Sequence, residues 1–279
     1  MITLSDFIGV GALATMEGGL VALPRADALD RLGRLRSPAW GALLPGSILV
    51  GTFGPQALPP MAWASVVLAG IATPLLATAA VLAVARGPRA AMLPITIMLL
   101  VGAEFVGGWT GQLFASLLTG LGCLTAGVAL VRLIPRHYML ISVLCMCVVD
   151  VTLLPTGAAQ ASAALMNHSA AHLHHAVFDH AAIGQVSTDY PDLVLAAILG
   201  GFVADHAVRR RAAALLTLLA AGYGMFLPRG GALPATVPIA VTFVIVGSHL
   251  ARQRRRTDRA RRRSRPPLGC DPEQAKMPA

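Results

Sequence analysis

Long apolar segments recur along the chain and are separated by short polar connections. Segments of about 20 apolar residues match the thickness of the hydrocarbon core of a membrane, and helices satisfy their backbone hydrogen bonds there. The weakest segment is the second, because Pro45 and Pro55 interrupt it. The sequence therefore predicts an all-α, polytopic transmembrane helix bundle of about nine spans, near residues 2–23, 39–57, 62–85, 91–108, 111–133, 138–156, 191–207, 211–227 and 232–251.

The positive charges alternate between the connections. Of the 22 Lys and Arg residues, 21 follow an odd-numbered segment, and Arg229 alone falls in an even-numbered connection. Because Lys and Arg collect on the cytoplasmic side of a membrane, the pattern predicts an outside N-terminus and a cytoplasmic C-terminus. Without the second segment, Arg86 and Arg89 would lie on the wrong side, so the alternation favours counting that segment as a span.

These boundaries divide the chain into three parts. Residues 1–136 hold five spans, residues 137–251 hold four spans with a His-rich external connection at 157–189, and residues 252–279 form a basic tail that we expect to be disordered. Only 13% of residues are charged and 56% are hydrophobic, which excludes an ordinary soluble domain. The basic tail fits anionic lipid better than nucleic acid, because it directly follows a span. The bias towards Arg and Ala suggests a bacterial plasma-membrane protein.

Histidines cluster in the connection at 157–189. If this alanine-rich segment is helical, four residues share one face at spacings of four, three and four: His168, His172, His175 and Asp179. Imidazole nitrogens and a carboxylate can bind a transition metal such as zinc or copper. The alternative is an external surface helix whose histidines are tolerated because they are neutral near pH 7.

Two acids stand inside apolar segments, Asp150 in the sixth and Asp192 at the start of the seventh. A carboxylate in hydrocarbon is costly unless it is paired, protonated or facing water, so both are candidate functional residues. Asp150 lies about 21 Å along a helix from Arg136, and Asp192 about 25 Å from Arg209. The acids are therefore expected at similar depth in the outer half of the membrane, on neighbouring antiparallel spans where they could face each other.

This arrangement resembles the GxGD intramembrane aspartyl proteases, the presenilin and signal peptide peptidase group. In that family two catalytic aspartates lie in the sixth and seventh of nine spans, and a PAL motif opens the ninth. The corresponding positions here are Asp150 in CVVDVTLLPTG, Asp192 in DYPDLVLAAILGG, and the substrate-binding residues Leu233, Pro234 and Ala235 in GGALPATVPIAVTF. The glycines of GxGD are replaced, since Tyr190 and Pro191 precede Asp192, and the PAL order is changed to Leu-Pro-Ala. The resemblance implies proteolysis of transmembrane peptides without a cofactor.

Three functions remain open at this point. The chain is an intramembrane aspartyl protease that uses Asp150 and Asp192, a membrane protein that binds or transports a metal through the histidines, or a non-catalytic scaffold whose tail docks lipid or a partner.

Overall fold

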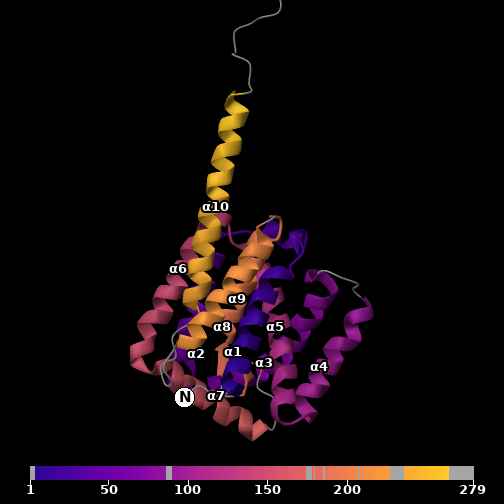
Figure 1. Cartoon of the computed structure of the whole chain (residues 1–279). Coiled ribbons are helices and arrows are strands. Elements are labelled where there is room, and N and C mark those ends of the chain that lie inside the picture. The colour runs from indigo at the N-terminus through magenta and orange to yellow at the C-terminus, as the bar shows by residue number, and fades with distance from the viewer. Residues whose placement is uncertain are drawn as a thin grey trace, which may run out of the picture. The chain divides into compact units, whose positions relative to one another are not determined.

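The computed structural model describes residues 4–85, 90–173, 178, 180–184, 186–206, 208–226 and 236–263, and these are mostly helical (Figure 1). The ten α-helices of the described residues are α1 (Leu4–Ala22), α2 (Leu43–Ala57), α3 (Pro59–Ala79), α4 (Leu93–Phe105), α5 (Gly108–Leu133), α6 (Arg136–Leu153), α7 (Ala158–Leu173), α8 (Tyr190–Val203), α9 (Arg209–Phe226) and α10 (Thr236–Arg263). Short helical turns cover Asp30–Leu35, Pro38–Ala42, Ala80–Val84, Ala90–Met92 and Leu154–Thr156. Residues 1–243 form one compact unit, and residues 244–279, with the second part of α10, form another.

Three helical stretches of the described chain are long and apolar enough to cross a membrane: Pro60–Val84, Gly108–Leu133 and Arg136–Leu153. Four shorter apolar stretches accompany them: Phe7–Ala22, Leu93–Phe105, Tyr190–Val203 and Thr236–Leu250. The helical class is therefore confirmed, while the count of nine spans and the orientation stay predictions. The sequence placed the start of the basic tail at residue 252, whereas α10 continues as a helix through Arg263.

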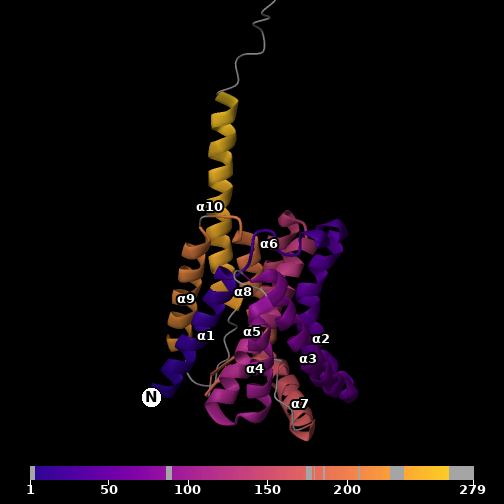
Figure 2. The same cartoon turned by 90° about the vertical axis from the view of Figure 1, so that its right-hand side faces the viewer.

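Helices α5 and α8 form the core of the first unit. Every residue of α8 from Asp192 to Gly200 is buried, which is typical of a helix that is apolar on all sides and enclosed by others. α5 packs directly on α8, because Gly127 lets the two backbones approach closely. Figures 1 and 2 show α1 and α9 beside this pair, with α3 and α4 next to α5. The core thus holds Asp192 at the first turn of a fully enclosed helix.

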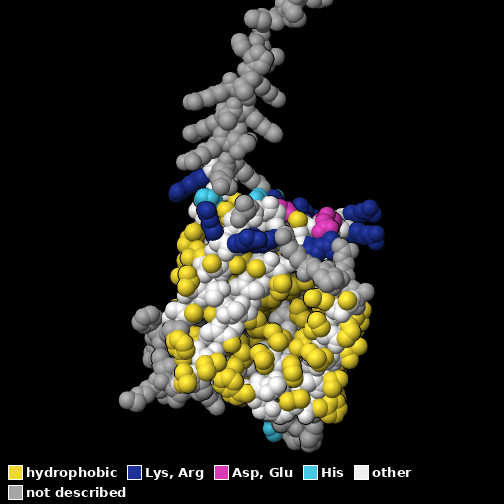
Figure 3. All heavy atoms as spheres, turned by 45° about the vertical axis from the view of Figure 1, so that its right-hand side comes forward, with side chains coloured by type: hydrophobic (Ala, Val, Ile, Leu, Met, Phe, Trp, Pro, Cys, Tyr) yellow, Lys and Arg dark blue, Asp and Glu magenta, His cyan; other side chains and the backbone are white. Residues whose placement is uncertain are grey.

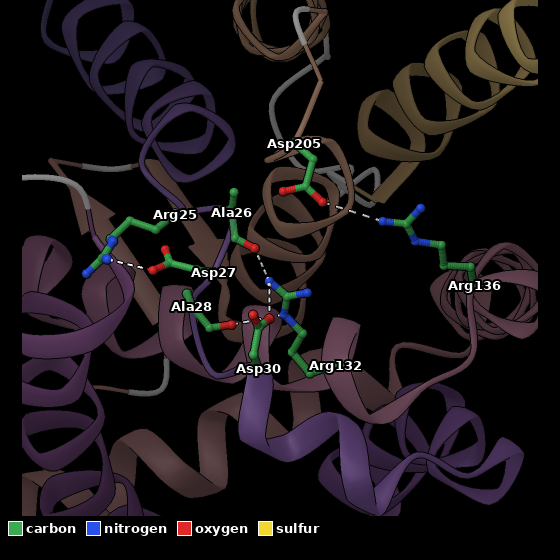
Figure 4. Close-up of polar contacts among 8 residues, drawn as sticks. All are labelled: Arg25, Ala26, Asp27, Ala28, Asp30, Arg132, Arg136 and Asp205. Atoms are coloured by element: carbon green, nitrogen blue, oxygen red, sulfur yellow. Dashed lines mark hydrogen bonds and ion pairs between the residues drawn. The ribbon is translucent and has the colours of Figure 1, made fainter. Parts of the chain in front are cut away.

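The arginines of the described part of the first unit gather at one end. On the face shown in Figure 3, the Arg, Asp and Glu side chains lie at the upper end, above a broad hydrophobic surface. At this end Arg136 on α6 faces Asp205 after α8, with 3.6 Å between Nη2 and Oδ2 (Figure 4). The backbone N–H of Arg25, after α1, donates to the Val84 carbonyl, after α3, at 3.0 Å. The ends of α1, α3 and α8 and the start of α6 therefore lie at the same end of the bundle.

The opposite end carries α7 and a β-hairpin of strands β1 (His180–Ile183) and β2 (Val186–Asp189). The strands pair antiparallel, and Gly184 turns between them with a φ of +67°. The Ser116 hydroxyl on α5 both donates to and accepts from the Ala182 backbone at 3.0 Å, which fixes β1 against α5. The sequence did not predict this hairpin. β2 leads directly into α8, so the hairpin determines where this helix, with Asp192 in its first turn, begins.

Arg132 at the end of α5 fastens the loop that follows α1. Its guanidinium donates to the carbonyls of Ala26 and Ala28 and pairs with Asp30 at 3.0 Å (Figure 4). We expect Arg132→Met to lower the free energy of unfolding by about 2 kcal/mol, because three charge-assisted contacts are lost at once. Arg25→Met removes an ion pair with the exposed Asp27 and should lower the free energy of unfolding by about 0.5 kcal/mol or less. The measurement is the unfolding midpoint of each purified variant in detergent, compared with that of the wild type. Equal midpoints for Arg132→Met and Arg25→Met would contradict the expectation.

Candidate functional site

Asp150 lies near the C-terminal end of α6, with its side chain half-buried. The hydroxyl of Thr236, the first residue of α10, donates a hydrogen bond of 2.8 Å to Asp150 Oδ2. Thr236 is only 1% exposed, so this bond forms inside the protein rather than on its surface. A hydroxyl donor in such surroundings both orients the carboxyl and stabilises negative charge on it.

Asp192 lies in the first turn of α8 and is 7% exposed. The backbone N–H of Thr236 donates to its carboxyl group. One residue therefore contacts both acids, with its hydroxyl on Asp150 and its amide on Asp192. The structure thus brings the two sequence-predicted acids together, although 42 positions separate them along the chain.

Two further residues belong to these surroundings. The thiol of Cys147, one turn before Asp150 on α6, donates to the Thr236 carbonyl at 3.8 Å, and it interacts electrostatically with both acids. Glu17 on α1 interacts electrostatically with Asp192 and is 2% exposed. None of the ion pairs found among the described residues includes Glu17, Asp150 or Asp192. The site is therefore a cluster of acids without an ion-paired cation in the described part of the chain.

The sequence did not identify Thr236, although a signal for it was present. Leu233, Pro234 and Ala235, the expected substrate-binding residues, lie outside the described residues, and Thr236 follows them directly. A Thr that precedes an apolar run with a Pro in its first turn is typical of a helix start. Such a residue has a side chain and an N–H available outside the regular helical hydrogen bonds, which is how Thr236 reaches two carboxyls.

The predicted histidine site is only partly within the described chain. His168 lies on α7 with an exposed side chain, and α7 confirms that this part of the connection is helical. The backbone of His172 is described but its side chain is not, and His175 and Asp179 lie outside the described residues. Among the residues that are described, no three His, Cys, Asp or Glu side chains gather in a way that could hold a metal ion. Zinc or copper binding at these positions therefore stays a prediction.

An arrangement in which one residue contacts two carboxyls suits chemistry that needs one neutral and one ionised acid. Two adjoining carboxyls in a low-dielectric interior do not both ionise, so one keeps a proton while the other can act as a base. Asp192 is enclosed and Asp150 is half-buried, so only the Asp150 side is partly open. No protein-family model, curated protein or solved structure matches this chain.

Proposed function

We propose that this chain is a multi-pass protein of the bacterial plasma membrane, and that it cleaves transmembrane peptides with Asp150 and Asp192 as an intramembrane aspartyl protease. The single observation that carries the proposal is the shared contact with Thr236, which holds two acids from different helices in one place. Burial of a carboxyl group in an apolar bundle costs free energy, and a single functional site would explain why the chain carries two of them.

The proposed membrane placement has nine spans with the N-terminus outside and the C-terminus in the cytoplasm. Its support is the gathering of Arg25, Arg132 and Arg136 at one end of the first unit (Figure 4). Positive charge at a single end fits the cytoplasmic face. Anionic lipid at that face is the proposed partner of the basic tail.

Catalysis in this proposal is hydrolysis of a peptide bond by a water held between the two carboxyls. The ionised carboxyl takes a proton from water, whose oxygen attacks the carbonyl carbon, while the protonated carboxyl donates its proton to the carbonyl oxygen. The tetrahedral intermediate then collapses: the C–N bond breaks, and the nitrogen leaves with a proton returned by the pair. No metal or organic cofactor is required for this sequence of steps.

The substrate is proposed to approach along α6. Val148, two positions before Asp150, and Val151, directly after it, are 62% and 46% exposed. α6 is apolar enough to cross a membrane, so exposed apolar side chains on it are suited to contact lipid or another apolar helix. A transmembrane peptide lying against this face would present its backbone to the more open of the two acids.

The test uses the purified full-length chain in liposomes with a panel of transmembrane peptides, and mass spectrometry detects the products. A peptide in which a hydroxyethylene group replaces the scissile bond mimics the tetrahedral intermediate. We expect it to inhibit cleavage and, when it carries a photoreactive group, to label α6 or α8. Absence of both cleavage and site-specific labelling would overturn the proposal.

A further inference from the structure

Glu17 is a buried acid whose role the two-aspartate site does not by itself explain. It lies on the inner face of α1 with Leu13, Ala14, Leu20 and Val21, each at most 3% exposed. Its Oε2 atom is buried and has no hydrogen-bond partner among the described residues. An unsatisfied polar atom in the interior is costly, so such groups usually bind water or a ligand.

The packing of α1 places Glu17 beside the helix that carries Asp192. A Cβ at Gly9 would lie 2.7 Å from the Ile183 carbonyl oxygen, and one at Gly200 would lie 2.4 Å from that of Leu20. α1 therefore runs in the same direction as α8, and it contacts the hairpin near its start and α8 near its end. Glu17, one turn before Leu20, lies alongside α8 and interacts electrostatically with Asp192.

Thr119 on α5 supplies a second buried oxygen near the same place. Its Oγ1 is also without a hydrogen-bond partner among the described residues, and Thr119 is 0% exposed. Its neighbours on the same face, one turn away on either side, contact the hairpin and the start of α8: Ser116 bonds Ala182, and the Cys123 thiol donates to the Tyr190 carbonyl at 3.9 Å. Thr119 thus faces the junction from which Asp192 extends.

A direct contact between α1 and α5 places Glu17 and Thr119 at the same level of the bundle. A Cβ at Gly120 would lie 3.2 Å from the Met16 sulfur. Thr119 and Glu17 each adjoin one member of this contact. Two unpartnered buried oxygens at one level of the bundle are the kind of polar partners that a buried water needs.

We propose that Glu17 and Thr119 hold ordered water against Asp192, and that Glu17 is a positioning residue which keeps the two-aspartate site hydrated. This role rests on the proposed proteolysis, because a hydrolase enclosed by apolar helices must obtain its water from a polar site within the bundle. The water-binding site itself does not depend on that activity. Glu17 is not a catalytic residue in this proposal, because it neither contacts the substrate nor exchanges a proton with it.

The test separates hydration from activity. The full-length protein, with ¹³C-labelled Asp and Glu, is reconstituted in liposomes, and water-edited solid-state NMR measures magnetisation transfer from water to the Asp192 carboxyl, assigned with Asp192→Asn. We expect Glu17→Met to abolish this transfer and Glu17→Gln to retain it, because an amide still binds water. Glu104→Met, an acid in the apolar helix α4 outside the site, is the matched control and should leave the transfer unchanged.

The same variants are then assayed with a cleavable peptide. Glu17→Met should lower kcat by about 10²-fold with little change in KM, and Glu17→Gln should recover most of the rate. Unchanged water transfer and kcat in a folded Glu17→Met protein would overturn the inference and leave the protease proposal standing. Glu17-dependent transfer in a wild-type protein that cleaves no peptide would support the water site and reject the protease. Circular dichroism shows whether Glu17→Met folds. If it does not, Thr119→Val, which also removes a water partner, serves as the second variant and should weaken the transfer of magnetisation from water.

Discussion

Asp150→Asn and Asp192→Asn are each expected to lower the rate of transmembrane-peptide cleavage by about 10⁴-fold or more. An amide has nearly the shape of a carboxyl, and it can still accept the hydrogen bonds that Thr236 donates. It can neither take a proton from water nor return one to the leaving nitrogen, so the loss falls on the chemical step. The measurement is kcat for one peptide in liposomes, with circular dichroism and unfolding midpoints to show that each variant folds.

Three controls make this result specific. Glu104→Gln changes an acid in another apolar helix, α4, and should leave the rate unchanged. Thr236→Val removes the hydroxyl that binds Asp150 and should lower the rate less than either Asp variant, while Thr236→Ser keeps the hydroxyl and should preserve most of it. A folded Asp192→Asn protein with normal cleavage would exclude Asp192 as a catalytic residue.

Gly127→Ala is expected to lower the free energy of unfolding by about 3 kcal/mol, or to prevent folding. A Cβ at Gly127 would lie 2.5 Å from the Ala197 Cβ and 2.8 Å from both the Ile198 nitrogen and the Val194 oxygen. Two of these are backbone atoms, so no side-chain rotation relieves the contact and α5 must move away from α8. Because α8 carries Asp192, folded Gly127→Ala protein should also lose cleavage activity.

The control for this substitution is Gly70→Ala on α3. No atom lies within 4 Å of a Cβ built there, and Ala favours a helix by about 1 kcal/mol over Gly. Gly70→Ala should therefore leave the unfolding midpoint unchanged or slightly raised, whereas Gly127→Ala lowers it. The midpoints of both variants in the same detergent provide the comparison, and equal midpoints would contradict close packing of α5 on α8.

Much of the helical architecture followed from the sequence, because apolar segment length is a local property. α5 occupies the segment predicted at 111–133, and α8 the one predicted at 191–207, each to within a few residues. The hairpin of β1 and β2 was not predicted, since two strands of four residues carry little periodicity. Its position depends on Ser116 of α5, which is 66 positions away from Ala182.

The sequence by itself determined which acids to consider, because Asp150 and Asp192 are conspicuous wherever hydrocarbon surrounds them. The depth argument also placed them at a common level, since helical rise is constant. Only the tertiary structure decided that Thr236 joins them and that Glu17 interacts electrostatically with Asp192. These relations arise from contacts of Thr236 with α6 and α8 and from the packing of α1 on α8, and such contacts between distant helices leave no periodic signal along the chain.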